Sequence, residues 1–555
     1  MQRAFPHIGF HPDFGSFADN NDRDGRTKDN EENMRFCSAE EAVELIRDGA
    51  TVIVDGSGGG VNEPGTILEA LEARFLATNS PRDLCVVHVS GMGSGHGDGI
   101  DRFAHVGMVK RVIGGHWGWT QGMQELAADN LIEAYCLPQG TISHLLRVAA
   151  AHGPGVISHI GLNTFVDPRI EGGRLNAAAV DDIVELVTLS GKEWIYTPVF
   201  PIDVAIIRGT TADENGNITM EGEGLLAETL AAAQAVKNNG GVVLAQVRNR
   251  VAAGTLIADQ VRVPGILVDA IVVDPAQRLS AATDRDPVLE GRKRLENVAI
   301  APMELGVRKV IARRAAAELR RGDIINLGFG MPDGVAAVLA EEGRASDVTF
   351  TVEQGHIGGV PAGGTDFGMA RNAQASVTSG QQFDWYDGGG VDIAVLSFAE
   401  VDAHGNVNVG RFGRRAPGVG GFINISQGSH RVVFVGTFVA GGKYDVDGSG
   451  SIALPEGGKQ KFVEQVQQIS FSGERATAVG QLVLYVSERA VFELGPDGLV
   501  LIELAPGADL ERDVIANMGF RPLVASTLSV MDPAFFTDAA RALELAGSAP
   551  AAEGA

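Results

Sequence analysis

Hydrophobic and polar residues follow one another in blocks that predict helices and strands in turn. Ser38 and Glu41 have the spacing of a capping box, and apolar residues then recur at helical spacing until Gly49. The apolar run TVIVD that follows predicts a short strand, the glycines of GSGGG predict a tight turn, and Pro64 opens a second helix. This part of the chain therefore predicts a helix, a strand, a turn and a helix in that order.

The same order of elements returns in the second half of the chain. Residues 312–355 read as a helix, an Arg-Gly-Asp stop, the strand IINLG, a glycine turn, a helix opened by proline and another strand. Residues 203–222 and 392–413 form a second pair, because each begins with Asp and an apolar strand and reaches a Gly-Asn turn after the same spacing. Two elements repeated in the same order indicate a duplicated α/β domain.

The alternation of strands and helices sets the fold class and the domain boundaries. We predict an α/β protein made of two similar open domains with mainly parallel sheets, covered by helices through right-handed crossovers. The two domains are expected at residues 34–285 and 301–540, joined by a charged linker at 286–300. The polar and charged residues 1–33 predict a flexible extension, and residues 541–555 predict a frayed tail.

Charge and cysteine content limit the possible classes of function. The formal net charge of −25 argues against nucleic acid or an anionic membrane as a partner. The three cysteines, Cys37, Cys85 and Cys136, form no Cys-x-x-Cys pair, which favours a reducing compartment over a disulfide framework or a zinc site. The sequence contains neither an apolar run of about 18 residues nor a signal-peptide core. We therefore expect a cytoplasmic protein that does not bind membranes.

Glycines gather where the predicted strands end. The chain holds 73 of them among 555 residues, roughly twice the usual share of about 7%. They follow the apolar runs TVIVD, VVHVS, IINLG and TFTVE. In open parallel sheets ligands bind beyond the carboxyl ends of the strands, where glycine turns let backbone N–H groups face the ligand. We therefore expect the ligand cleft at these turns.

One acidic residue stands at such a strand end. Glu353 follows the apolar run VTFTV and precedes a glycine-rich turn. Aligning the two halves at Gly91 and Gly355 places Val89 opposite Glu353, so this position is apolar in one half and acidic in the other. A carboxylate there suits a general base, a metal ligand or a nucleophile. Because only His356 lies near it in the loop, the sequence gives little support to a metal site.

The remaining glycine and histidine motifs do not define a nucleotide or zinc site. The stretch GSGGGVNEPG departs from the dinucleotide-binding pattern, and no phosphate-binding loop with Gly-Lys-Ser/Thr occurs. The histidines of the His- and Trp-rich segment 88–119 are spaced too irregularly for a zinc ligand set. Its stretch GGHWGWTQ fits an aromatic wall as well as a binding site.

A further cluster combines small glycines with positive charge. Residues 416–426, APGVGGFINIS, follow Arg411, Arg414 and Arg415, so backbone donors and cations could meet an anionic substrate there, although a flexible loop would look the same. Gln139 lies in a Pro-Gln-Gly turn just before a predicted helix, where a capping or turn residue is the default interpretation.

These segments together resemble the family I coenzyme A transferases, nearest to the acetate or propionate CoA-transferase branch with both halves fused in one chain. The resemblance extends from about residue 35 to residue 525. It rests on the collinear motifs SAEEAVELIRDG, EAYCLPQG, TFVDPRIEGGRLN, IRGTTADENGNIT, TVEQGHIGGVPAGGTDFG, QFDWYDGGGVDIA and PGVGGFINISQ. The segment 88–119 carries more His and Trp than the short-chain members lead us to expect, which leaves the acyl specificity open.

The resemblance implies an activity and a nucleophile. Glu353 would attack an acyl-CoA thioester, and a glutamyl-CoA thioester would form and then react with an acceptor acid in a ping-pong mechanism. Coenzyme A would be a substrate, with no cofactor and no metal. The partners implied are an acyl-CoA and a carboxylic acid of the acetate or propionate kind, together with further copies of the chain in a dimer or tetramer. An acyl-CoA hydrolase on the same scaffold and a non-catalytic acyl-CoA or metabolite sensor remain alternatives.

The resemblance also implies the residues around the nucleophile. The donors to the oxyanion and the contacts to CoA would come from Gly420, Gly421, Phe422 and Gln139. The glycines that line the cleft would be Gly58, Gly59, Gly60, Gly388 and Gly389.

Overall fold

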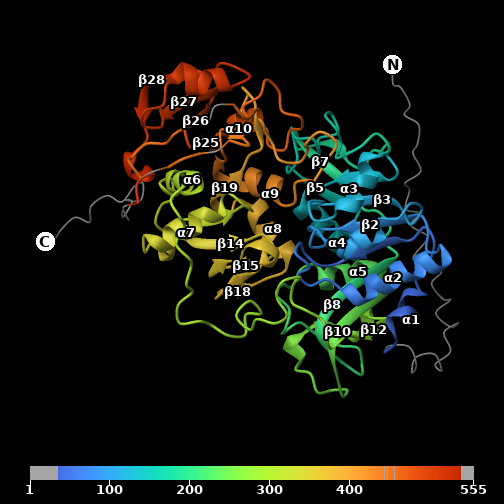
Figure 1. The fold of residues 1–555 in the computed structure, drawn as a ribbon. Helices are drawn as coiled ribbons and strands as arrows, with labels where there is room; N and C mark the ends of the chain where they lie inside the picture. The colour runs from blue at the N-terminus through green and yellow to red at the C-terminus, as the bar shows by residue number, and fades with distance from the viewer. Residues whose placement is uncertain (1–35, 443, 447, 455–456, 539–555) are drawn as a thin grey trace, which may run out of the picture.

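Two open sheets, one from each half of the chain, organise the protein (Figure 1). The computed structural model describes residues 36–442, 444–446, 448–454 and 457–538. The predicted extension at residues 1–33 and the predicted tail at 541–555 lie outside the described residues. In the described part of the chain, no helix is long and apolar enough to cross a membrane.

The first sheet is mainly parallel. Its strands run in the order β11-β9-β8-β1-β2-β3-β4, and β10 and β12 extend it from β8. The parallel strands are β1 (Thr51–Val54), β2 (Leu84–His88), β3 (Val109–Gly114), β4 (Glu133–Cys136), β8 (Val204–Asp213), β10 (Val242–Val251) and β12 (Ala270–Val273). The antiparallel ones are β9 (Ile218–Thr219) and β11 (Val261–Val263). The helices of this half are α1 (Ala39–Val43), α2 (Gly65–Thr78), α3 (Gln121–Ala128), α4 (Gln139–Ala150) and α5 (Thr229–Asn238). A separate antiparallel sheet contains β5 (Gly155–Ser158), β6 (Glu185–Leu189) and β7 (Lys192–Pro198).

The second sheet follows the same plan and is longer at one edge. Its order is β18-β15-β14-β13-β19-β22-β25-β26-β27-β28. The strands are β13 (Ile324–Leu327), β14 (Thr349–Val352), β15 (His356–Ile357), β18 (Ala375–Ser376), β19 (Val391–Ser397), β22 (Ser429–Val435), β25 (Leu482–Val486), β26 (Ala490–Gly495), β27 (Gly498–Leu504) and β28 (Leu523–Val530). The helices are α6 (Val307–Ala316), α7 (Asp333–Glu341), α8 (Ser379–Asp387), α9 (Phe422–Gly428) and α10 (Gly473–Val479). Short two-stranded ladders join β16 (Val360–Pro361) to β17 (Ala370–Arg371), β20 (Glu400–Val401) to β21 (Val407–Asn408), and β23 (Val439–Ala440) to β24 (Lys459–Gln460).

The strand registers confirm that the two halves are related. The order β12-β10-β8-β1-β2 in the first sheet matches β25-β22-β19-β13-β14 in the second. An aspartate at the start of each of the matching strands β8 and β19 accepts a hydrogen bond from the first N–H of the neighbouring strand, Asp203 from Thr51 and Asp392 from Ile324, both at 2.8 Å. The predicted α/β fold with two similar, mainly parallel sheets is therefore correct.

The acidic turns after β8 and β19 are also copies of each other. The Oδ1 atom of Asp213 accepts from the N–H of Asn217 at 2.9 Å, and Oδ1 of Asp402 accepts from the N–H of Asn406 at 3.1 Å. Each asparagine then accepts with Oδ1 from a glycine N–H further along the chain. The repeat seen in the sequence is thus a repeat of hydrogen bonds.

The first predicted helix is shorter than its sequence pattern. The capping box of Ser38 and Glu41 is present, yet α1 ends at Val43 and not near Gly49. Arg74 of α2 donates to the carbonyl oxygens of Val43 and Ile46 at 2.5 and 2.9 Å. These carbonyls are satisfied by a side chain, and the backbone leaves the helix in turns.

One hydrophobic core continues from the first half into the second. It includes apolar side chains under α4 and α5 as well as Phe383 and Tyr386 of α8 and Ile423 of α9. The segment proposed as a linker, 286–300, also packs: Leu289 is buried in a small apolar cluster that holds residues of both halves. The two halves therefore meet along an extensive packed seam.

Candidate active site

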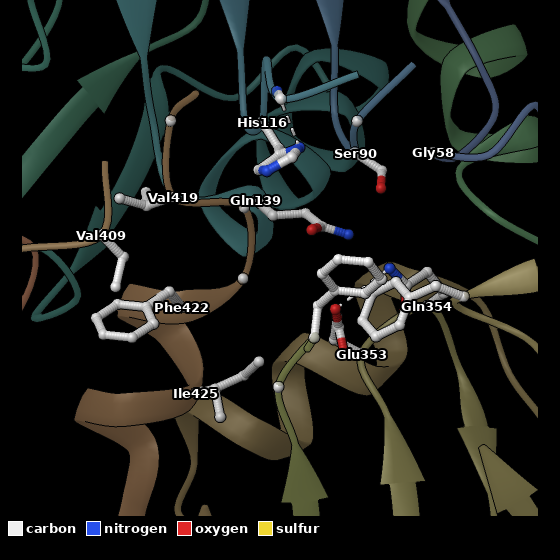
Figure 2. Close-up of a pocket in the computed structure, with 18 of the residues that line it drawn as sticks. Gly58, Ser90, His116, Gln139, Glu353, Gln354, Val409, Val419, Phe422 and Ile425 are labelled. Atoms are coloured by element: carbon white, nitrogen blue, oxygen red, sulfur yellow. Dashed lines mark hydrogen bonds between the residues drawn. The ribbon is translucent and has the colours of Figure 1, made fainter. Parts of the chain in front are cut away.

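A cavity of about 570 Å³ lies in the seam, at the carboxyl ends of strands from both halves (Figure 2). The first half contributes Ser57, Gly58, Ser90, His116, Trp119 and Gln139 to its wall. The second half contributes Glu353 with Asn326, Phe329, Phe367, the loop 418–421 and the start of α9. The structure thus brings together loops that lie hundreds of residues apart in the chain.

Glu353 directly follows β14 and is buried, with 7% of its surface exposed. The Nδ2 atom of Asn326 donates to its Oε2 atom at 3.4 Å, and Nε2 of Gln354 donates to Oε1 at 3.2 Å. Burial raises the pKa of Glu353 above its ordinary value, while the hydrogen bonds from its own backbone and from these two amides oppose the shift. The site therefore holds a carboxylate that is poorly solvated and only lightly hydrogen-bonded.

Asn326 is positioned by a small buried network. It lies on β13, beside Thr351 of β14, and its Nδ2 atom is 3.3 Å from both the Thr351 carbonyl oxygen and the Tyr386 hydroxyl. The Tyr386 hydroxyl donates to Oγ1 of Thr351 at 2.7 Å. Burial raises the pKa of Tyr386, so its hydroxyl stays protonated. This network fixes the amide that faces Glu353.

The register of the strands places the nucleophile candidate in only one half. Thr51 pairs with Cys85 in the first sheet, and Ile324 pairs with Thr349 in the second. Counting four residues onward from Cys85 and Thr349 gives Val89 and Glu353 at the same structural position, so the predicted alignment of these two residues is confirmed.

The glycine loop before α9 offers one backbone donor to the cavity. The N–H of Gly420 donates to the Gly115 carbonyl at 2.8 Å, and the N–H of Phe422 donates to the Val419 carbonyl at 3.0 Å. Among the hydrogen bonds of the described residues, none uses the N–H of Gly421. A Cβ atom at Gly421 would lie 3.3 Å from Cγ of Glu353. Of the three predicted backbone donors, Gly421 is thus the one that is both free and beside the carboxylate.

Gln139 reaches the same place from the first half. It begins α4, and its backbone N–H donates to the Gly420 carbonyl at 3.0 Å, which ties the two halves together. Its side chain is buried, and its Nε2 atom has no hydrogen-bond partner in the described part of the chain. Figure 2 shows this amide extending into the cavity on the side that faces Glu353.

Gly58 lines the cavity, but the other two glycines of its turn do not. A Cβ atom at Gly58 would overlap the indole of Trp119. Gly59 faces the Thr365 carbonyl, which a Cβ would overlap, and Gly60 faces Ala281. The expectation that Gly59 and Gly60 line the cleft is therefore corrected: these glycines let the turn pack against neighbouring backbone.

Gly388 and Gly389 also lie away from the cavity wall. Gly388 is the C-cap of α8, and its N–H donates to the Asp384 carbonyl at 3.3 Å. Gly389 has a φ of 91°, a left-handed conformation that ends the helix. The expectation that they line the cleft is corrected, because they serve to terminate α8.

The stretch GGHWGWTQ forms part of the wall. A Cβ atom at Gly91 would come within 2.9 Å of the His116 imidazole and 2.7 Å of the Trp119 indole, so the glycine makes room for both rings. Burial and the proximity of His88 lower the pKa of His116 to about 4, which leaves it neutral near pH 7. Trp119 continues the wall into the second half, where its ring meets Phe329 with centroids 6.1 Å apart.

The arginines of the 411–415 segment do not reach the cavity. Arg411 pairs with Glu171 at 3.3 Å, and Arg414 pairs with Asp129. These cations therefore join the halves outside the cavity, and an anionic substrate at Glu353 would not meet them.

A second contact across the seam copies the first. The N–H of Ser379, at the start of α8, donates to the Ala227 carbonyl at 3.3 Å, just as Gln139 donates to Gly420. Ala227 and Gly420 share a left-handed backbone, with φ of 45° and 55°. The next residue is Gly421 in one contact and Glu228 in the other.

Two buried acidic side chains, Glu228 and Asp55, accept hydrogen bonds at this second contact. Ser143 donates to Oε1 of Glu228 at 2.9 Å, and Thr229 donates to Oδ2 of Asp55 at 2.5 Å. Burial raises the pKa of both carboxyls, and the nearby Asp55 raises that of Glu228 further. This copy of the site has neither an acid in the place of Glu353 nor a free glycine N–H.

Asn326 is a site residue that the sequence interpretation missed. Its signal was available, since it is a polar residue inside the apolar strand IINL. Tyr386, Phe329 and Phe367 gave no such signal, because residues distant in the sequence place them: Tyr386 contacts Asn326 and Thr351 from α8, and Phe329 packs on Phe367.

Comparison with known proteins identifies the family. The family model described as coenzyme A transferase matches residues 36–274. The chain is 44% identical over 505 residues to the acetate CoA-transferase YdiF of Escherichia coli K12, covering 91% of this chain and 95% of the relative. It is 42% identical over 512 residues to the caffeate CoA-transferase of Acetobacterium woodii, covering 91% and 98%. The crystal structure of the acyl-CoA transferase YdiF of E. coli O157:H7 as a thioester complex with CoA superimposes with a TM-score of 0.88 at 42% identity, covering 92% of this chain and 98% of that one.

The chain therefore belongs to the coenzyme A transferase family. It is an enzyme, a transferase of coenzyme A, as the sequence motifs predicted. The agreement with the YdiF fold covers both halves, so the fused arrangement of two related sheets is the arrangement of that enzyme as well.

Proposed function

We propose that Glu353 is the nucleophile that carries coenzyme A between an acyl-CoA donor and a carboxylate acceptor. Its carboxylate attacks the thioester carbonyl, and the CoA thiolate leaves to give a mixed anhydride. The thiolate then attacks the glutamyl carbonyl, the donor acid departs as its carboxylate, and a glutamyl-CoA thioester remains. An acceptor carboxylate reverses these steps, which gives ping-pong kinetics.

The observation that carries this proposal is the pair of unused donors beside Glu353. Each addition step creates a tetrahedral oxyanion, which requires N–H groups that are not already engaged. The N–H of Gly421 and the Nε2 of Gln139 meet this requirement, one from each half of the chain. The N–H groups of Gly420 and Phe422 are engaged by carbonyl oxygens, so we assign these residues to shaping the loop.

The burial of Glu353 suits the chemistry of the intermediate. A glutamyl thioester is lost if water reaches it, and a carboxylate in a cavity between two halves is sheltered from bulk water. The raised pKa of Glu353 also makes it a more basic carboxylate than an exposed one. Coenzyme A is accordingly a substrate here, and the acyl groups are those of monocarboxylic acids of the acetate or propionate kind.

Intact mass spectrometry tests the nucleophile. Wild-type protein incubated with acetyl-CoA without an acceptor acid is expected to gain one CoA in thioester linkage, mapped to Glu353 by peptide analysis. Glu353→Gln keeps the shape and the burial of the side chain but cannot attack, so it should gain nothing and lose turnover while remaining folded. An adduct that persists in this variant would reject Glu353.

The same reaction separates a transferase from a hydrolase. The protein is expected to release CoA at a rate that depends on the concentration of acceptor acid, with the label of the acceptor appearing in new acyl-CoA. Release of free CoA and acid at a rate that ignores the acceptor would show that water intercepts the intermediate.

We also propose a cytoplasmic homo-oligomer, a dimer or tetramer, with domains at residues 34–285 and 301–540. The cytoplasm is supported by Cys37, Cys85 and Cys136, which form no disulfide. Oligomerisation is supported by β28, an edge strand of eight residues without charge or proline, which is typical of a strand that another chain covers. Light scattering coupled to size exclusion would test the oligomer, and a monomeric mass would reject it.

A further inference from the structure

Helix α4 begins at Pro138, and a proline side chain has no oxygen that could cap the first turn. The first N–H groups of a helix have no partner within the helix, so they need acceptors from elsewhere. At the start of α4 both acceptors come from the second half of the chain. Gln139 donates to the Gly420 carbonyl at 3.0 Å, as described above. Gly140 donates to Oδ1 of Asn424 at 3.1 Å. Asn424 therefore caps a helix that belongs to the other half.

The two sides of the Asn424 amide are fixed by opposite kinds of neighbour. Asn424 is fully buried on the first turn of α9, three residues after Gly421. Its Nδ2 atom donates to both carboxylate oxygens of Asp387 in α8, at 2.8 and 3.1 Å. An acceptor on one side and the Gly140 N–H on the other require the amide nitrogen and the amide oxygen where they are. A Cβ atom at Gly140 would lie 2.4 Å from Nδ2, so the missing side chain lets α4 come this close.

The second contact across the seam is capped in a different way. There α8 begins with a capping box of its own, formed around Thr378. In the first contact Asn424 lies four residues after Gly420. The same count from Ala227, the residue that matches Gly420, reaches Ala231, whose side chain cannot accept a hydrogen bond. The cap supplied by the opposite half thus accompanies the contact that lies beside the cavity.

We propose that Asn424 is a positioning residue that fixes the two oxyanion donors relative to each other, Nε2 of Gln139 on α4 and the N–H of Gly421 before α9. This inference rests on the proposed function, in which both groups stabilise the oxyanion at Glu353. The donors belong to different halves, so contacts across the seam set the distance between them. A displacement of about 1 Å in such groups can cost roughly 100-fold in rate.

Asn424→Ala removes the cap and leaves both donors in the chain. In transfer from acetyl-CoA to propionate, kcat should fall by about 10- to 100-fold while KM for acetyl-CoA stays within about twofold of wild type. The CoA adduct on Glu353 should still form, but more slowly.

Asn406→Ala is the matched control. Asn406 has the same pattern of hydrogen bonds, because its Nδ2 atom donates to Oδ2 of Asp402 at 3.0 Å and its Oδ1 atom accepts from the Gly473 N–H at 3.1 Å. All three residues belong to the second half, away from the donors. Asn406→Ala should lower the urea concentration at which the protein unfolds and keep kcat within about threefold of wild type.

Two double variants show whether the role is positional. Gln139→Met should lower kcat by a much smaller factor in the Asn424→Ala background than in the wild type, because a misplaced donor contributes little. Asn424→Asp keeps an acceptor for Gly140 but places a carboxyl against Asp387. Burial raises the pKa of Asp387 to about 7, so at about pH 8 the two acids repel each other and kcat should fall. Adding Asp387→Asn restores one donor and one acceptor with their roles exchanged, and kcat should return to within about threefold of wild type.

The inference is overturned if Gln139→Met lowers kcat by the same factor in both backgrounds, since independent effects would mean that Asn424 only stabilises the fold. It is also overturned if Asn424→Ala keeps kcat within about threefold of wild type, or if the exchanged pair folds without regaining kcat. Should Asn424→Ala fail to fold, the exchanged pair decides alone. A wild-type protein that forms no CoA adduct would instead reject the nucleophile, and full activity of Gln139→Met alone would reject that donor, so these failures are distinguishable.

Discussion

Replacement of Gln139 by methionine should lower the activity while leaving the stability of the folded state unchanged or higher. Methionine has nearly the shape of glutamine but no amide, so the change removes a buried Nε2 atom that has no partner in the described part of the chain. An unsatisfied buried donor costs about 1–3 kcal/mol, so its removal should leave the folded state as stable as wild type or more stable. Loss of one oxyanion donor lowers kcat by roughly 100- to 1000-fold, or about 2.7–4 kcal/mol of transition-state stabilisation.

Two measurements check this prediction. Urea unfolding gives the free energy of unfolding, and steady-state transfer from acetyl-CoA to a carboxylate gives kcat and KM. We expect kcat to fall by at least 100-fold with little change in KM, and Gln139→Glu to be slower still because its carboxylate would repel the oxyanion. The reasoning is refuted if Gln139→Met keeps kcat within about threefold of wild type, or if it loses stability in step with activity.

Two further predictions concern buried carboxylates. In Asn326→Ala the acidic limb of the pH profile of kcat/KM should move to higher pH, because a hydrogen bond that lowers the pKa of Glu353 is lost; an unchanged limb would count against Glu353 as the titrating group. Burial and Asp55 raise the folded-state pKa of Glu228, so the stability linked to its proton is present below the ordinary carboxyl value of 4.5 and is lost as pH rises through the folded pKa. Glu228→Gln should therefore gain stability relative to wild type between pH 5 and pH 8 in urea unfolding, and a difference that does not grow with pH would contradict this.

The features predicted correctly from the sequence are those set by local pattern and by the repeat. Glu353 stood out because an acid ended an apolar strand and because its counterpart Val89 was apolar, and the strand registers confirm that these positions correspond. Both signals are contained within short segments, so they did not require knowledge of how the halves pack.

The sequence predictions that were wrong concern the end of a helix and the roles of glycines. The end of α1 depends on Arg74 of α2. Its guanidinium donates hydrogen bonds to two carbonyl oxygens that a longer helix would pair with its own backbone N–H groups. Gly388 and Gly389 lie within one of the motifs that carry the family resemblance. A glycine-rich stretch can end a helix as readily as it can line a cleft, and here it ends α8. Which backbone N–H groups remain free also depends on the other half, since Gly115 provides the acceptor for Gly420.

If Glu353 is the nucleophile, as we propose, the related contacts across the seam account for one active site in each chain. A fold with two related sheets presents two places where a strand end, a left-handed residue and a helix start meet. We propose that Glu353 and Gly421 make one of them reactive, and the residues that correspond to them in the other half are Val89 by strand register and Glu228 by loop position. Introducing an acid at Val89 would not reproduce the site, because Glu228 takes the place of Gly421 in the loop and its N–H donates to Oδ1 of Asp55 at 3.2 Å. It would raise the cost of burying charge without creating a second nucleophile. On this proposal, the single site depends on both the acid at the strand end and the glycine that faces it.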